Sequence, residues 1–241
     1  MKLRMTSGYT LIELVIIILI IGVLATVAIR QIGTTVDTAE IEQTKRELDN
    51  LARAIVGTPE AVANGTRTDF GYVGDNGALP PTLAALAINP GLATWNGPYM
   101  TGGIGPGDFQ TDAWGVAYAY VDTLIRSTGS GSPIDKQIAH STADLLNNTV
   151  SGQVLNADGS MPGATYADSI ALQLIYPSGG SLTTATQYPD QVGGFTFSGI
   201  PIGNHSLRMI YIPDSDTVTF QVAVYPGRPA VVQLVSPADL W

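Results

Sequence analysis

Hydrophobic side chains are unevenly distributed along the 241-residue chain. Residues 9–29 form an apolar run whose only charged side chain is that of Glu13. As a helix rising about 1.5 Å per residue, this run matches the ~30 Å hydrocarbon thickness of a bilayer. Farther along, apolar residues recur at helical spacing until Gly57 and Pro59 end the pattern. The pattern therefore predicts one long helix over residues 9–57, apolar first and amphipathic afterwards.

The next segment, residues 58–148, mixes short periodic stretches with turn residues. The stretch beginning at Leu83 predicts a short helix, and residues 112–120 predict a turn that leads into a strand. We expect this segment to form a small α/β head that packs against the amphipathic part of the long helix.

From residue 149 onward the alternation has period two, which is typical of half-buried strands. The turns between strands contain Gly with Asp or Pro. The predicted strands cover residues 150–155, 170–176, 195–197, 207–212, 217–225 and 230–235. Residues 149–241 are therefore expected to form an all-β sandwich, and the whole chain belongs to the α+β class.

Composition narrows the functional classes. The chain carries 11 Lys and Arg against 20 Asp and Glu, a formal net charge of −9, which disfavours binding to nucleic acid. The absence of cysteine excludes disulfides and thiolate chemistry. The two histidines, His140 and His205, are expected in solvated positions, as are Asp214 and Asp216. We expect no cofactor, no metal and no catalytic residues; an anchored enzyme would need a catalytic constellation that the sequence does not show.

The apolar N-terminal run has three interpretations. One is a single-pass anchor, oriented with its N-terminus in the cytoplasm because Lys2 and Arg4 precede it. Another is a signal peptide cut near Ala28, against which Glu13 interrupts the apolar region. The third accounts for the basic leader, the glycine that ends it and Glu13 together.

In this third interpretation the segment resembles the class III signal of type IV pilins and type II secretion pseudopilins. A short basic leader, residues 1–8, ends in Gly8; Tyr9 follows, then Glu13 at the fifth mature position and Gly22 at the fourteenth. The resemblance implies cleavage between Gly8 and Tyr9 by a prepilin peptidase and N-methylation of Tyr9. Two residues depart from the family pattern: Tyr9 replaces the usual Phe, and Arg30 stands where Pro is frequent.

A carboxylate inside an apolar helix is costly, so Glu13 is a functional candidate. After cleavage, the ammonium of Tyr9 in one subunit can pair with Glu13 of a neighbour, which would set the stagger between helices. We call this the registry role of Glu13. The alternative is that Glu13 complements the N-terminal dipole of its own helix.

The head resembles that of the major pseudopilin of type II secretion. A Trp-x-Gly-Pro-Tyr element begins at Trp95, and the structural motif Asp-x-Trp-Gly-x-x-Tyr is present as Asp112, Trp114, Gly115 and Tyr118. The resemblance implies a calcium site in the following loop, residues 127–135. Because Asp135 is its only carboxylate, we do not expect a metal there.

The last segment resembles the carboxypeptidase regulatory-like (transthyretin-like) domain. The matching strings are residues 152–154, 158–159, 162–164 and 194–203, followed by Leu207. The resemblance implies a binding or supporting role without catalysis.

The resemblances together imply a structural subunit of a type IV pilus-like filament or of a type II secretion pseudopilus. The alternative is a minor or tip subunit whose C-terminal sandwich binds a substrate or surface. The implied partners are further copies of the chain, a prepilin peptidase and an inner-membrane assembly platform. The chain would lie in the inner membrane before assembly, and afterwards in a periplasmic pseudopilus or an extracellular pilus of a bacterium.

Overall fold

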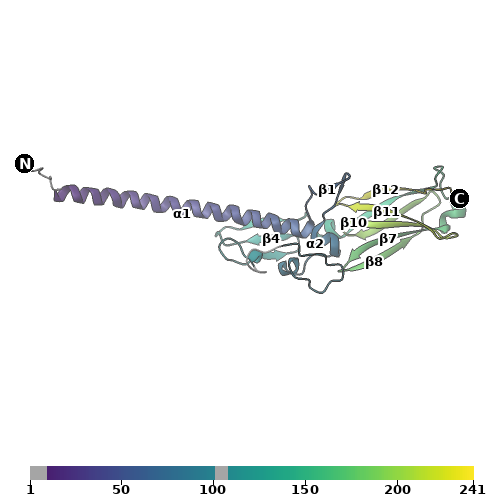
Figure 1. Cartoon of the computed structure of the whole chain (residues 1–241), viewed down its shortest axis with the longest axis horizontal. Coiled ribbons are helices and arrows are strands. Elements are labelled where there is room, and N and C mark those ends of the chain that lie inside the picture. Colours follow the sequence, from purple (N-terminus) through teal and green to yellow (C-terminus); the bar gives the residue numbers. More distant parts are fainter. Residues whose placement is uncertain (1–9, 101–107) are drawn as a thin grey trace, which may run out of the picture.

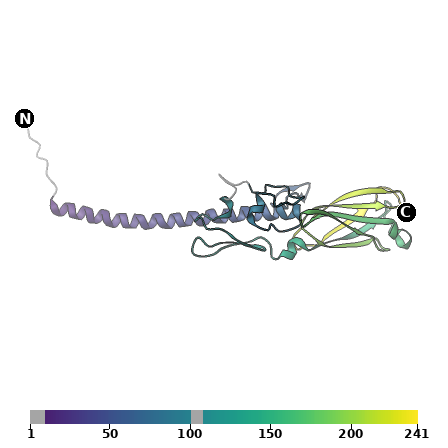
Figure 2. The ribbon, with the colours of Figure 1, turned by 90° about the horizontal axis from the view of Figure 1, so that it is seen from below.

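The molecule is elongated, with one long helix at one end and a β-sandwich at the other (Figures 1 and 2). The computed structural model describes residues 10–100 and 108–241, including all of their side chains except those of 27–36 and 108. Helix α1 (Leu11–Val56) extends away from the body, and its C-terminal half packs against the head. The predicted α+β class is confirmed.

Helix α1 has 46 residues, about 69 Å at ~1.5 Å per residue. Thr10 caps its N-terminus in extended backbone conformation. At the other end Gly57 has φ 80° and donates its N–H to the carbonyl of Arg53 at 2.7 Å. A Cβ on Gly57 would collide with the Asp69 backbone, which explains why glycine stands here. The helix thus ends where the sequence pattern predicts.

The head surrounds the C-terminal half of α1. Leu48, Leu51 and Ile55 of α1 are almost completely buried against it. Its three-stranded sheet is antiparallel in the order β3-β4-β5. The short helix predicted at Leu83 is present as the 3-10 helix η1. The head elements are β1 (Val62–Ala63), β2 (Thr66–Arg67), α2 (Gly71–Asn76), η1 (Leu83–Leu86), η2 (Asp108–Gln110), β3 (Ala119–Val121), β4 (Leu124–Ser127), β5 (Ile134–Gln137) and α3 (Thr142–Leu146).

The C-terminal region is a β-sandwich of two sheets, ordered β11-β10-β7-β8 and β12-β6-β9. The first is antiparallel throughout; in the second, β12 runs parallel to β6. Its elements are β6 (Asn148–Leu155), α4 (Gly163–Tyr166), η3 (Ala167–Ser169), β7 (Ile170–Ser178), β8 (Ser181–Gln187), β9 (Gly194–Ile200), β10 (Gly203–Tyr211), β11 (Asp216–Val224) and β12 (Ala230–Val235).

Each predicted strand of this region is present, but the sequence pattern misses β8. Six of its seven residues are exposed, so no apolar face repeats along it. Its pairing with β7 from Ser178↔Ser181 onward forms the edge of the larger sheet. Because both faces of this edge strand are largely exposed to solvent, its sequence shows no alternation of apolar and polar residues from which a strand could be predicted.

The head and the sandwich share an interior at their junction. Ile202, which lies between β9 and β10, is fully buried in the hydrophobic cluster of the head. The β7–β8 turn also enters the head: the Gly180 N–H donates to the Asn76 carbonyl at 2.7 Å, and the Thr94 N–H donates to the Gly180 carbonyl at 3.1 Å. The sandwich therefore continues the body of the head along the molecular axis (Figure 2).

Candidate functional site

The N-terminal part of α1 presents an apolar surface that nothing in the described part of the chain covers. Twelve large apolar side chains between Leu11 and Leu24 are 43% to 84% exposed. They occupy every position of this stretch except Glu13 and Gly22, so apolar side chains surround the helix on every side. Apolar surface of this extent marks an interaction site. Among the described residues, no helix combines the length and hydropathy that crossing a membrane requires.

Glu13 lies in the first turn of α1 and forms a capping box with Thr10. The Glu13 N–H donates to Thr10 Oγ1 at 3.4 Å, and the Thr10 N–H donates to Glu13 Oε2 at 3.5 Å. Within one chain the carboxylate therefore serves its own helix end, as the alternative interpretation expects. The predicted cleavage residues Gly8 and Tyr9 lie outside the described residues, so the registry role remains a prediction.

Three residues of the head motif, Asp112, Trp114 and Gly115, lie in one tight turn, and Tyr118 follows it. The carboxylate of Asp112 accepts hydrogen bonds from the backbone N–H groups of Trp114, Val116 and Gly129, and from the Ser127 hydroxyl at 2.6 Å. Burial raises the pKa of Asp112, but these four bonds outweigh burial and bring the pKa below its ordinary value. Asp112 thus holds together two loops as a buried, ionised acceptor.

The same motif attaches the loop to α1. Gly115 has φ 78° and closes the turn with its N–H on the Asp112 carbonyl at 2.8 Å. Tyr118, which is buried, donates its hydroxyl to Glu47 Oε2 at 2.8 Å, and Thr44 accepts the N–H of Ala113 at 3.3 Å. Burial and the Glu47 carboxylate together raise the pKa of Tyr118. The half-buried Trp114 is not part of the head's main cluster.

In the loop that would carry the implied calcium site, the only carboxylate, that of Asp135, is paired with an arginine. Asp135 pairs with Arg126 on the adjacent strand through two bonds of 2.6 and 2.7 Å. In the described part of the chain, no three His, Asp or Glu side chains gather as metal ligands would. The loop supplies only hydroxyls and carbonyls besides this paired aspartate.

The prediction that His205 is solvated is wrong. His205 lies in β10, is 1% exposed, and contacts the Pro201 carbonyl through Nε2 at 2.8 Å. Its Nδ1 is buried and lacks a partner within the described residues. The alternation of β10 directs this position inward on the same face as Gly203 and Leu207, so strand register decides its burial. Asp214 and Asp216 are exposed, as expected, although Asp216 begins β11.

Acidification is expected to destabilise the protein through His205. Burial lowers the pKa of His205 below its ordinary 6.5, with the Pro201 carbonyl opposing this in part. The unfolded chain therefore binds the proton more readily, and stability falls as pH decreases below about 6.5, by up to ~1.4 kcal/mol per pH unit. Urea unfolding at several pH values measures this slope. His205→Gln should flatten it, whereas the control His140→Gln, at an exposed position, should not; equal slopes in all three proteins would refute the assignment.

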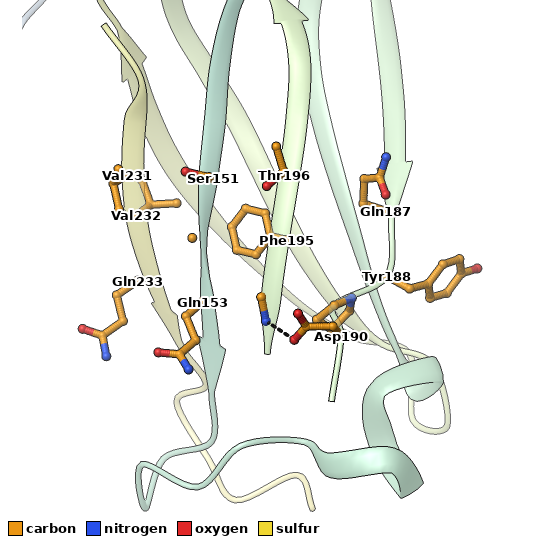
Figure 3. Close-up of a pocket in the computed structure, with 13 residues that line it drawn as sticks. Ser151, Gln153, Gln187, Tyr188, Asp190, Phe195, Thr196, Val231, Val232 and Gln233 are labelled. Atoms are coloured by element: carbon orange, nitrogen blue, oxygen red, sulfur yellow. Dashed lines mark hydrogen bonds between the residues drawn. The ribbon is translucent and has the colours of Figure 1, made fainter. Parts of the chain in front are cut away.

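A shallow groove of 970 Å³ lies on the outer face of the smaller sheet (Figure 3). Its lining combines hydroxyl, amide, aromatic and valine side chains from β6, β9 and β12 and from the end of β8 with the segment that follows it. This groove was not predicted from the sequence. The alternation of polar residues at Ser151 and Gln153 was the available signal, but only the assembled sheet brings the four segments together.

Comparison with known proteins gives a sequence relative from a secretion system. No protein-family profile matches the chain. The type II secretion system core protein G of Pseudomonas aeruginosa is 27% identical over 143 residues, which cover 56% of this chain and 83% of that protein. The chain is thus similar to a secretion-system component over a little more than half its length.

Comparison with solved structures gives weaker likenesses. A dioxygenase domain from Streptomyces sp. SirexAA-E has a TM-score of 0.30 at 16% identity, covering 39% of this chain and 81% of that one. A streptococcal ancillary pilin has a TM-score of 0.28 at 13% identity, with coverages of 49% and 43%. The major pilin subunit of Bacillus cereus has a TM-score of 0.26 at 13% identity, with coverages of 52% and 41%. None of these scores is high enough to support a functional argument.

Proposed function

We propose that the chain is a structural subunit of a type IV pilus-like filament or a type II secretion pseudopilus. The observation that carries the proposal is the uncovered apolar surface of α1 between Leu11 and Leu24. Such a surface is stable only when lipid or other helices cover it. The similarity to core protein G and the leader-like residues 1–8 support the same role. Copies of the chain would pack through α1, and the head and sandwich would lie outside.

The proposal includes the route to the filament. The chain would first be held in the inner membrane by its apolar run, with Lys2 and Arg4 on the cytoplasmic side. A prepilin peptidase would cleave after Gly8, and an inner-membrane assembly platform would extract the subunit. The assembled filament would be a periplasmic pseudopilus or an extracellular pilus.

Processing is the first test of the proposal. We expect mass spectrometry of the mature protein to show a chain that begins at Tyr9 and carries an N-methyl group, because the leader ends in glycine before an aromatic residue and Glu13. The control is Gly8→Ala, which should retain the full-length chain. A mature wild-type protein that begins at Met1 or near Ile29 would contradict the proposal.

A second candidate is a minor or tip subunit whose sandwich binds a substrate or surface. The observation that favours it is the open groove on the sandwich, at the end of the molecule opposite to the N-terminus of α1 (Figure 1). In a filament built on α1, this end would face outward. Copy number separates the two candidates, since a main filament subunit must be abundant.

We also propose that residues 149–241 form a separate folding unit. Its two sheets enclose their own core, whose fully buried members include Val150, Leu172 and Leu207. The isolated segment is expected to melt cooperatively with β-type circular dichroism, at a lower temperature than the full chain because Ile202 loses its partners in the head. Ile202→Thr should reduce aggregation of this fragment. A disordered fragment would contradict the division.

A further inference from the structure

The groove on the smaller sheet is built from outward-facing positions of neighbouring strands. Ser151 of β6, Thr196 of β9 and Gln233 of β12 project from one face of the sheet, because alternate residues of a strand share a face (Figure 3). Gln187 and Tyr188 extend the lining beyond the edge of this sheet. The result is an open polar groove that crosses the strands.

The charges of the lining restrict the ligand. No Lys or Arg is among the described residues that line the groove, so a phosphate, sulfate or other anion would find no counter-charge. One oxygen of the Asp190 carboxylate is already used: Oδ1 accepts the N–H groups of Val192 at 2.9 Å and Gly194 at 2.7 Å. The groove therefore suits an uncharged ligand.

Its remaining polar groups are free to bind. Gln153 donates Nε2 to the Val192 carbonyl at 2.8 Å, which fixes its orientation. By contrast, Ser151, Thr196 and the amides of Gln187 and Gln233 make no side-chain hydrogen bond to any other described residue. Each amide offers both donors and acceptors, and each hydroxyl offers both as well. A ligand rich in hydroxyl groups matches this set.

Tyr188 supplies the apolar part of the recognition. Its side chain is 54% exposed and projects outward from the end of the groove, away from Ser151 and Thr196 (Figure 3). A sugar ring has hydroxyls around its rim and C–H bonds on its faces, and an exposed aromatic ring packs against such a face. We propose that the groove binds a neutral oligosaccharide, with Tyr188 stacking on one ring and Gln187 and Gln233 hydrogen-bonded to hydroxyls. The volume of 970 Å³ lies at the upper end of the ~300–1,000 Å³ typical of ligand sites.

This inference deepens the second candidate of the proposed function, on which it rests, by naming a ligand class. Glycan binding can be measured separately from filament assembly, since the groove lies on the sandwich and the proposed assembly surface lies on α1. A variant can therefore lose glycan binding without losing filament assembly, and the experiment measures both.

The test uses the full chain, purified in a zwitterionic detergent without a sugar headgroup, on an array of neutral and acidic oligosaccharides. The best neutral ligand is then titrated by calorimetry. We expect neutral glycans to be retained, and Tyr188→Ala and Gln233→Ala each to weaken binding about tenfold. Tyr188→Phe, which keeps the ring, should bind much more tightly than Tyr188→Ala. Tyr166→Ala is the matched control, because Tyr166 is an exposed tyrosine outside the groove.

Three results would overturn the proposal that the groove binds a neutral oligosaccharide. Retention of no neutral glycan by the folded protein would overturn it, as would preference for acidic glycans or equal binding by Tyr188→Ala and Tyr166→Ala. Filaments are counted in cells that express the same variants. Tyr188→Ala should leave filament yield unchanged, so a loss of glycan binding there leaves the assembly role standing.

Discussion

Glu13→Ala is expected to reduce filament assembly at least a hundredfold. If the Glu13 carboxylate pairs with the Tyr9 ammonium of a neighbouring subunit, the substitution leaves that ammonium unpaired among apolar helices. Breaking a buried ion pair costs ~3–5 kcal/mol, and ~1.4 kcal/mol corresponds to a tenfold change. Removing a charge makes the segment more apolar, so membrane insertion should not suffer. Electron microscopy of sheared cell-surface material and fractionation of the cells measure the two effects.

The capping box provides the matched control for this experiment. Thr10→Ala also removes the cap of α1 but leaves the carboxylate of Glu13 in place. Loss of a cap costs about 0.5–2 kcal/mol within each subunit. The registry role predicts filaments from Thr10→Ala and almost none from Glu13→Ala. Filaments in wild-type amounts from both variants would show that Glu13 acts only on its own helix.

Asp112→Ala is expected to lower the free energy of unfolding by about 3 kcal/mol, because it deprives four donors around a buried carboxylate of their acceptor. For a chain of this length, that loss corresponds to a decrease in melting temperature of roughly 6–12 °C. Detachment of the turn from α1 should accompany it, since Tyr118 and Glu47 meet beside the same turn. Thermal unfolding followed by circular dichroism measures the effect.

Two further variants serve as controls for Asp112→Ala. Asp214→Ala removes an exposed aspartate whose side chain makes no hydrogen bond to a described residue, and should change stability by less than about 0.5 kcal/mol. Asp112→Asn keeps the size and one acceptor oxygen, so its effect should be intermediate. A melting temperature of Asp112→Ala equal to that of Asp214→Ala would show that the motif does not hold the head together.

Local sequence signals account for most of the fold. The end of α1 at Val56 follows from Gly57, whose positive φ and contact with Asp69 tolerate no side chain. The strands with one buried face, such as β11 with Val222 and Val224 inward, show the expected alternation. Strand β8 escapes prediction because it buries almost nothing, and His205 because its burial depends on the register of β10.

The candidate sites can be predicted from the sequence only in part, because they depend on contacts that form in the folded chain or between subunits. Gly8, Tyr9 and Glu13 come from a motif, and the geometry of a single chain gives Glu13 a local partner in Thr10. A contact between subunits is a property of the assembly. The groove arises when β6, β9 and β12 align, so residues such as Ser151 and Gln233 become neighbours only in the folded sheet.

Cryo-electron microscopy of filaments from the native cells tests the central claim most directly. The proposed role predicts a helical assembly of this chain with α1 at the centre from Tyr9 onward, Glu13 near a neighbour's N-terminus, and the sandwich on the outer surface. Filaments that lack this chain, or an assembly in which α1 lies outside the filament core, would contradict the proposed role.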